Sequence, residues 1–409
     1  MKRLLILAAC ALLSGATSAN DPIRTASGPD QATRTEGSGQ GTSTSPLLAS
    51  LTTIYADGDK EVSWGGRLMN DFGFFSKDDS YPATTEDGFE FRRARFFAHV
   101  KLFDTVEAKA QYDFAGETAT FKDVWMKFPT PFGKLQVGHF KQPLSIEELT
   151  SSRFVTFMER AAPVEAFAPS RDNGVATGGS LGENTNWAFG IFRRSDGAAT
   201  GTGDGEFTST GRLTHHWGEG DHVTHVGVAL SSWSGQDVRF RTRPEAHLVS
   251  RALDTTTMSS DSTFLTSLEA AWVDGPLSAQ AEFLQASVDR FGAAGNVDLT
   301  GWYAFVSYFL TGESRHYKAP GKFDRVHPNE NWSGSGFGGG AWELAARISS
   351  TDFDEVSGGT LTNLTAGVNW YLNPNARIML NLVHSNLDNG AAGIDEDMNA
   401  LMMRFQVDW

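Results

Sequence analysis

The sequence has almost no cysteine, no long apolar run beyond its first twenty residues and little positive charge. Its one cysteine, Cys10, lies within the first twenty residues, so no disulfide can hold the rest of the chain together. Beyond the first twenty residues, no apolar stretch approaches the roughly 18 residues that a membrane-spanning helix requires. The 34 Lys and Arg residues face 49 Asp and Glu residues, which argues against binding to nucleic acid. The fold must therefore depend on a packed core or a closed sheet.

Residues 1–19 are typical of a Sec signal peptide. They combine the basic residues Lys2 and Arg3 with an apolar stretch and end on Ala19, so we expect cleavage there and export of the protein. A buried first helix and a lipoprotein box at 7–10 are the alternatives. Without residues 1–19 the chain keeps 32 basic against 49 acidic side chains, a net charge of -17. Residues 20–61 are rich in Gly, Ser and Thr and are predicted to form a flexible polar leader.

From residue 62 to the end, the sequence repeatedly alternates apolar and polar residues, which is typical of β-strands. In the last stretch Leu401, Met403, Phe405 and Val407 share one face, and Met402, Arg404, Gln406 and Asp408 share the other. About sixteen such segments occur, near 62–76, 88–102, 105–115, 119–129, 133–140, 173–181, 185–194, 205–217, 221–233, 263–274, 276–288, 298–311, 340–352, 360–372, 375–387 and 397–409. The predicted fold class is all-β.

The connections favour a transmembrane β-barrel over a soluble sandwich or propeller. Tight turns all fall on the side of the two chain ends, whereas 141–172 and 234–262 are long and lie on the other side. The segment 312–339 is long although it falls on the turn side, so it is predicted to fold into the lumen unless a strand has been miscounted. In such a barrel one face of each strand meets lipid and the other lines water.

Aromatic residues near strand ends predict the two interfacial girdles of a membrane barrel. They are Trp64, Phe72, Phe74, Trp187, Trp233, Trp272, Trp302, Tyr308 and Trp409. Trp409 ends the last strand, as is the habit of outer-membrane barrels, and is expected to close the barrel and present that strand to the outer-membrane assembly machinery.

Catalytic and metal-binding patterns are missing from the sequence. There is no HExxH pair and no GxSxG elbow, and the ten histidines are scattered. The glycine-rich run 334–340 precedes a strand instead of opening a helix, which does not suit a phosphate-binding loop. We therefore predict neither an enzyme nor a protein with a cofactor or a metal ion.

Arginine and lysine are the residues that suggest a function. In "FEFRRARFFAHVKLF" alternation places Arg93, Arg95 and Lys101 on the inward face and Arg92 on the lipid face. Over all inward faces eleven basic residues oppose nine acidic ones, so the wall alone is nearly balanced. A preference for anions would have to come from the long connections.

Those connections carry basic residues at several positions. They are Arg153 and Arg160 in 141–172, Arg239, Arg241 and Arg243 in 234–262, and Lys318 and Lys322 in 312–339. The three arginines at spacing two are either a solvated loop edge or a ladder for anions. Arginine binds oxyanions bidentately and stays charged, and rings of basic residues mark anion pores.

Several blocks resemble the phosphate-selective porin O and P family over about 62–409. They are "FEFRRARFF", "GHFKQPLSIEELTSSRFVTFMERA", "RTRPEAH", "LTGESRHY", "GAWELAARIS" and "VNWYLNPNARIMLN", in this order. The resemblance implies a sixteen-stranded homotrimeric porin of the bacterial outer membrane, in which 141–172, 234–262 and 312–339 fold into the lumen.

The resemblance also implies roles for particular residues. Arg92 and Arg93 would line the constriction together with basic groups of 141–172, Lys318 and Lys322 would form a basic cluster on the periplasmic side, and "VRFRTR" would be an anion ladder. We expect a passive channel for small anions such as phosphate or polyphosphate. The alternatives are a general porin with little phosphate preference and a soluble secreted β protein that binds carbohydrate.

Overall fold

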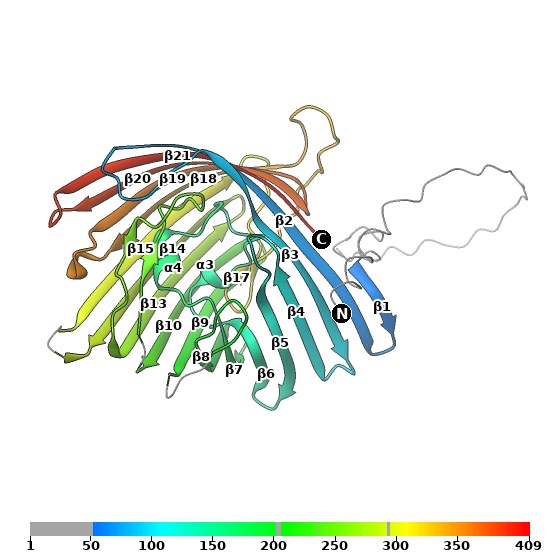
Figure 1. The fold of residues 1–409 in the computed structure, drawn as a ribbon. Helices are drawn as coiled ribbons and strands as arrows, with labels where there is room; N and C mark the ends of the chain where they lie inside the picture. The colour runs from blue at the N-terminus through cyan, green and yellow to red at the C-terminus, as the bar shows by residue number, and fades with distance from the viewer. Residues whose placement is uncertain (1–51, 202–205, 236, 293–294) are drawn as a thin grey trace, which may run out of the picture. The chain divides into compact units, whose positions relative to one another are not determined.

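Sixteen antiparallel strands close into a β-barrel in the computed structural model of the protein (Figure 1). The structure describes residues 52–201, 206–235, 237–292 and 295–409. The barrel strands are β2 (Lys60–Lys77), β3 (Gly88–Leu102), β4 (Val106–Asp113), β5 (Thr120–Thr130), β6 (Gly133–Lys141), β7 (Arg171–Leu181), β8 (Thr185–Arg193), β9 (Thr208–Glu219), β10 (His222–Ser234), β13 (Ser260–Asp274), β14 (Leu277–Arg290), β15 (Val297–Phe309), β18 (Ala341–Asp352), β19 (Thr360–Asn373), β20 (Ala376–Asn389) and β21 (Ile394–Asp408). The all-β, sixteen-stranded prediction is confirmed.

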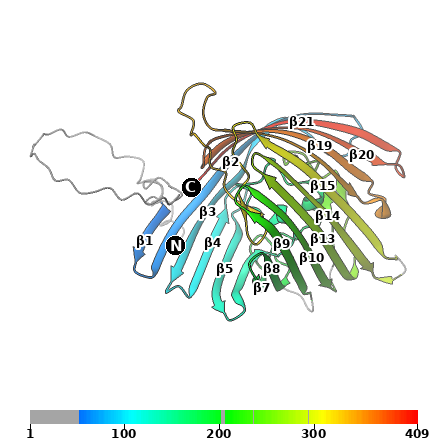
Figure 2. The same ribbon diagram turned by 180° about the vertical axis from the view of Figure 1, so that it is seen from behind.

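The strands pair with their neighbours in chain order, and β21 returns to pair with β2 (Figure 2). Two- and three-residue turns such as 131–132 and 275–276 join the strands at one end of the barrel. The segment between β15 and β18 lies at this same end although it is long, as the strand count predicted. No helix among the described residues is long and apolar enough to cross a membrane.

The outer face of the barrel is apolar at every second position. On β21, Leu401, Met403, Phe405 and Val407 are 37–45% exposed, whereas Met402, Arg404, Gln406 and Asp408 are buried. Leu344 and Ile348 of β18 are likewise exposed. Such a row of large exposed apolar side chains around a closed sheet is the lipid-facing surface of a membrane barrel. Trp409 exchanges backbone hydrogen bonds with Gly66, at 3.1 and 3.2 Å, and so extends the β2–β21 seam.

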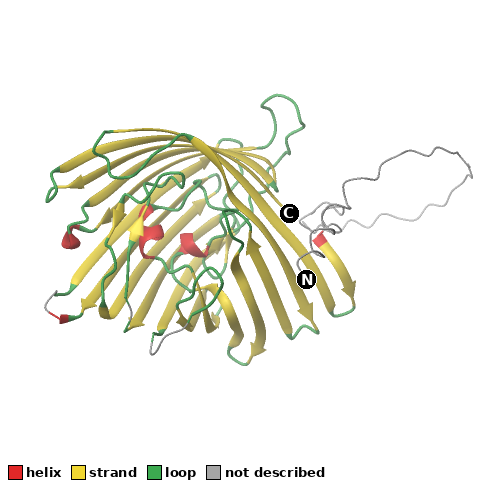
Figure 3. Cartoon of the chain, in the orientation of Figure 1, coloured by secondary structure: helices red, strands yellow, loops and turns green. Residues whose placement is uncertain are grey.

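Two long external connections fold into the barrel and fill one side of it (Figure 3). The 142–170 connection carries the short helices α3 (Ile146–Leu149) and α4 (Ala162–Phe167), and the 235–259 connection carries the two-residue strands β11 (Arg241–Thr242) and β12 (Leu253–Asp254). Their apolar side chains, Phe157 and Phe240 among them, form one buried core with inward residues of the wall such as Met379 and Met402. The prediction that inward residues line water is therefore wrong on this side, because the connections exclude it.

The N-terminal boundary of the barrel also differs from the prediction. The predicted signal peptide and residues 20–51 of the predicted leader lie outside the described residues. Within the rest of that leader, β1 (Thr53–Asp57) forms a hairpin with the start of β2. Gly58 and Asp59 form the two-residue turn, and glycine suits its first position because Gly58 adopts a positive φ of 58°. The leader prediction was too long for this reason.

One residue of the predicted aromatic girdles faces the other way. The side chain of Trp233 points inward, where its ring stacks on Phe240 with 6.1 Å between centroids, and its Nε1 donates to Ser231 Oγ at 2.9 Å. The outward face of β10 is set by exposed residues such as Val226 and Leu230. Trp233 is an odd number of positions from both, so it belongs to the inner face. Its prediction as a lipid-facing residue was wrong.

Candidate functional site

A polar cavity of about 700 Å³ lies between the β2–β7 side of the barrel and the segments folded into it. The connection 142–170 contributes Ser151, Ser152 and Arg153, and the 235–259 connection contributes Arg243 and Arg251. The long segment of the turn side contributes from its small hairpin of β16 (Tyr317–Lys318) and β17 (Lys322–Phe323). All three of the segments that were expected to fold inward therefore meet at one cavity.

Strand β3 directs two consecutive arginines into this cavity. Met69 of β2 pairs with Arg93 and Asn70 pairs with Phe91, so Arg92 is an extra residue in the ladder. Such a β-bulge breaks the alternation and re-aims a side chain. Arg92 consequently reaches Glu159 of the 142–170 connection, with its Nε 2.8 Å from Oε1. The prediction that alternation turns Arg92 to lipid was wrong because of this bulge.

Strand β5 repeats the arrangement two strands away. Ala110 of β4 pairs with Val124 and Tyr112 pairs with Phe121, so the two residues between them, Lys122 and Asp123, both line the cavity. The carbonyl of Lys122 is 2.6 Å from His139 Nδ1 on β6. A side chain thus satisfies a carbonyl at the point where the ladder is interrupted.

The cavity wall is strongly basic although the whole chain is acidic. Among the described residues, four acidic ones line it, namely Asp123, Glu148, Glu165 and Asp324. Fourteen basic residues line it, namely Arg67, Arg92, Arg93, Arg95, Lys109, Lys122, Lys141, Arg153, Arg160, Arg171, Arg243, Arg251, Lys318 and Lys322. At a formal net charge of -15 for the chain, this gathering of cations in one place sets up a local positive potential.

Most of these cations have an acidic partner. Lys109 and Arg171 share Asp123, and Arg243 and Arg251 share Glu165, at 2.7–3.1 Å. Within the described part of the chain, four make no ion pair: Arg67, Arg93, Lys122 and Lys322. Arg67 donates to Ser152 Oγ at 2.7 Å, and Arg93 donates from Nη1 to the Met69 sulfur, a weak acceptor, at 3.8 Å. These four charges are the ones most available to a mobile anion.

The pKa values of Glu148 and Lys322, which both lie in the inserted segments, are shifted by burial and by neighbouring charges. Burial acts to raise the pKa of Glu148, but Arg160 and Lys141 outweigh it and hold this pKa below its usual value. Burial lowers the pKa of Lys322, and the neighbouring ammonium of Lys318 lowers it further. The lowered pKa of Glu148 and the contribution of Lys318 to the lowered pKa of Lys322 both follow from nearby positive charge.

Eight of the ten residues predicted as anion-binding line the cavity: Arg92, Arg93, Arg95, Arg153, Arg160, Arg243, Lys318 and Lys322. The three loop arginines do not act as one row. Arg243 reaches the cavity, whereas Arg239 forms an ion pair with Asp254, with Nε 2.7 Å from Oδ1, and Arg241 is exposed. Neither Arg239 nor Arg241 belongs to the cavity wall.

Six basic residues of the wall were missed as site residues. They are Arg67, Lys109, Lys122, Lys141, Arg171 and Arg251. Alternation had placed Arg67 and Lys109 on the inward face, and that signal was available. Lys122 was hidden by the bulge of β5, and nothing in the local pattern distinguishes Arg251 from a solvated loop residue. No group of three or more potential metal ligands converges within the described ranges.

A closed sixteen-stranded barrel with an apolar belt, whose loops fold into a charged lumen, defines a porin, that is, a channel of the bacterial outer membrane. The chain belongs to the family described as phosphate-selective porin O and P, whose model matches residues 62–409. This rules out the soluble carbohydrate-binding alternative.

Two relatives match most of the sequence. Porin O of Pseudomonas aeruginosa is 28% identical over 406 residues, which cover 85% of this chain and 89% of that protein. An uncharacterized protein of Caulobacter vibrioides is 27% identical over 350 residues, covering 80% of this chain and 69% of the other.

Solved porins share the fold at low sequence identity. The anion-selective porin from Comamonas acidovorans has a TM-score of 0.54 at 13% identity and covers 85% of this chain and 99% of its own. OprB of Pseudomonas putida has a TM-score of 0.56 at 9% identity, with 85% and 94% covered. A trimer form of Vibrio cholerae OmpT has a TM-score of 0.53 at 10% identity, with 86% and 99% covered. At these identities the likeness concerns the fold alone.

Proposed function

We propose that this porin conducts small anions passively, phosphate or polyphosphate among them, through the basic cavity. The observation that carries the proposal is the excess of fourteen basic over four acidic residues around one polar space. The family name and the name of the Comamonas acidovorans porin, which describe phosphate-selective and anion-selective channels, agree with it.

The mechanism we propose is a relay of weak sites. Arg67, Arg93, Lys122 and Lys322 offer charges that no described carboxylate pairs with, and the paired arginines exchange carboxylate for anion as the ion passes. At an effective dielectric of about 20, a charge pair at 4 Å gains about 4 kcal/mol before desolvation is subtracted. A site much tighter than millimolar, about -4 kcal/mol, would slow release. Because most cations are already partly neutralised, each site stays shallow enough to pass the ion on.

Planar-bilayer recordings of the purified protein test the proposal. In a KCl gradient, the reversal potential should show anion preference, and added inorganic phosphate should reduce the chloride current. Cation preference would contradict the proposal. Anion preference without phosphate block would favour the alternative of a general porin, to which the many carboxylate-paired arginines of the cavity also point.

We further propose that the channel is a homotrimer, as in the trimer form of the Vibrio cholerae relative in fold. Crosslinking in detergent should give a ladder that ends at three copies, whereas a ladder ending at one or two copies would contradict this proposal.

A further inference from the structure

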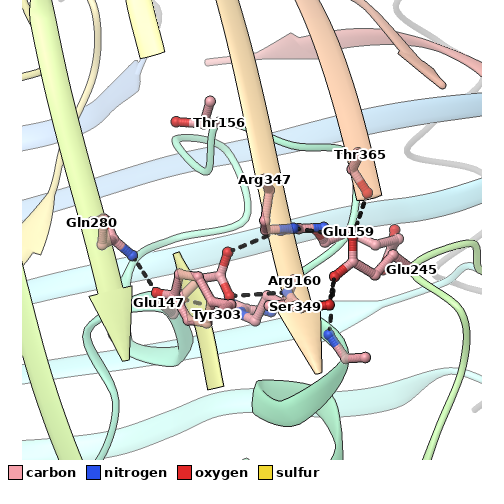
Figure 4. Close-up of polar contacts among 12 residues, drawn as sticks. Glu147, Thr156, Glu159, Arg160, Glu245, Gln280, Tyr303, Arg347, Ser349 and Thr365 are labelled. Carbon is pink, nitrogen blue, oxygen red and sulfur yellow. Dashed lines mark hydrogen bonds and ion pairs between the residues drawn. The ribbon is translucent and has the colours of Figure 1, made fainter. Parts of the chain in front are cut away.

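Arg347 of β18 lies on the wall opposite the basic cavity and holds both external connections (Figure 4). Its side chain is 1% exposed. Its Nη2 lies 2.5 Å from Oε2 of Glu245 in the 235–259 connection, and its Nη1 lies 3.4 Å from Oε1 of Glu147 in the 142–170 connection. The same Nη1 donates to the carbonyl of Glu159 at 3.1 Å. One guanidinium therefore fixes the 142–170 connection at two points and the 235–259 connection at a third.

The two carboxylates are embedded in further donors. Glu245 accepts hydrogen bonds from Ser349 Oγ at 2.7 Å and Thr365 Oγ1 at 2.5 Å, both on the barrel wall. Glu147 accepts from the backbone N–H of Ala161 at 3.0 Å. Burial raises the pKa of Glu147, and Arg347 works against that rise. A buried carboxylate is tolerated only with such partners, so both acids depend on Arg347 for their place.

These acids lie directly behind the basic cavity. Arg160, which lines that cavity, donates from Nε to the carbonyl of Glu147 at 3.0 Å. Glu245 borders a smaller recess of about 170 Å³ together with Arg92, Arg160 and Arg243, three residues that the basic cavity also includes. A movement of either connection toward the cavity would thus add a carboxylate to a wall in which four of the described residues are acidic.

We propose that Arg347 is a specificity-determining positioning residue, which keeps Glu147 and Glu245 turned away from the conduction path. The inference rests on the proposed anion conduction. Arg347 acts through the two connections and does not itself line the cavity. Its role is to keep two negative charges out of a positive passage and to lock both connections in one arrangement.

The test compares the anion-to-cation permeability ratio of wild type and Arg347→Gln in KCl gradients. In the variant the carboxylates lose their main counter-charge and the connections loosen, so the ratio should fall by about threefold or more. Adding Glu147→Gln and Glu245→Gln to Arg347→Gln should restore the ratio. A purely architectural role does not predict this rescue, because the triple variant loses more native contacts than the single one.

Arg377→Gln provides the matched control. Arg377 is also a buried wall arginine that grips the 142–170 connection, since its Nη1 donates to the Val155 carbonyl at 2.8 Å. Its side-chain partners include Gln406 and Tyr371, and no carboxylate pairs with it in the described part of the chain. Losing this charge strands no acid, so the ratio should fall less than in Arg347→Gln.

Heat-modifiable migration of each variant in gels shows whether its barrel has formed. If Arg347→Gln does not fold, Arg347→Lys replaces it, with a smaller fall in the ratio that Glu147→Gln restores. The proposal is overturned if the folded Arg347 variant matches wild type or Arg377→Gln, or if neutralising the acids leaves the ratio low. Failure of the proposed function itself is distinguishable, because wild type would then show no anion preference.

Discussion

The guanidinium of Arg93 differs from most basic groups around it in what it touches. It is 5% exposed and borders the cavity, yet its contact is the sulfur of Met69, and its Nε has no hydrogen-bond partner among the residues that the structure describes. A buried donor with no acceptor is unfavourable unless something else satisfies it. An anion passing through the cavity can supply that acceptor, whereas Arg95 beside it is already occupied by Asp113 at 2.6 Å.

Arg93→Gln is therefore expected to weaken phosphate block of the chloride current by about tenfold, the loss of one charge-assisted contact of roughly 1.4 kcal/mol. Arg241→Gln is the comparison, because Arg241 is exposed and lies outside the cavity wall. Its block constant should stay within about twofold of wild type, as for a solvated loop arginine. Equal losses in the two variants would restore the ladder interpretation.

Glu159 gives a prediction about pH. Burial favours its neutral form, but Arg92 and Arg404, each 2.8 Å away, outweigh burial and hold its pKa well below the usual 4.5. A carboxylate with a depressed pKa stabilises the folded state fully above its unfolded pKa, and the stabilisation is lost as the pH falls through the folded value.

At pH 7, Glu159→Gln should consequently lower the temperature at which the folded band disappears in heat-modifiability gels. The difference between wild type and variant should shrink as the pH is lowered below 4.5. A difference that is constant from pH 7 to pH 3 would show that the charge of Glu159 contributes nothing.

At the scale of elements, the two bulged strands decide where the cavity lies. β3 and β5 flank β4, and in each an extra residue turns two consecutive polar side chains inward: Arg92 with Arg93, and Lys122 with Asp123. Alternation could not reveal this, because a bulge shifts the face by one position without changing the composition of the strand. The lipid-facing residues on either side of each bulge still look regular.

The backbone of β6, next to the β5 bulge, requires glycine at position 138. Gly138 of β6 has a φ of +130°, and a Cβ there would lie 2.3 Å from the carbonyl oxygen of Val124. Gly138→Ala should destabilise the barrel by about 1–3 kcal/mol through backbone strain, measured by urea unfolding in lipid vesicles. Gly390→Ala is the control, because a Cβ at Gly390 meets no atom of the described residues within 4 Å. Equal stability of the two variants would mean that the strand relaxes around the new methyl group.

For the whole molecule, the sequence predicted which residues face lipid, but it did not predict which inward residues meet water. Lipid requires an apolar residue at every second position, so strands such as β19, with Leu364 exposed, were located to within a few residues. The inner face has no such uniform environment. Met379 and Val383 both point inward, yet they lie in a dry core with the external connections. Which inward residues meet water depends on long-range packing that no local pattern records.

The separation of charge over the whole chain also predicts an effect of salt. The basic cavity is enclosed in a chain of formal net charge -15, and at 1 M salt the Debye length is about 3 Å, against about 10 Å at 0.1 M. Anion preference should therefore rise as KCl is diluted from 1 M to 0.1 M, measured by reversal potentials at a fixed gradient. A preference that does not change with dilution would indicate that size, not charge, selects the ion.

The seam between β2 and β21 bears on biogenesis. These strands pair from Arg67 with Asp408 to Lys77 with Met398, and they are the first and last strands of the cylinder in chain order. Until they pair, the nascent sheet has two open edges, whose unpaired backbone N–H and C=O groups cannot be satisfied in hydrocarbon. A polypeptide cut short before β21 is therefore expected to fail to insert instead of forming a narrower channel.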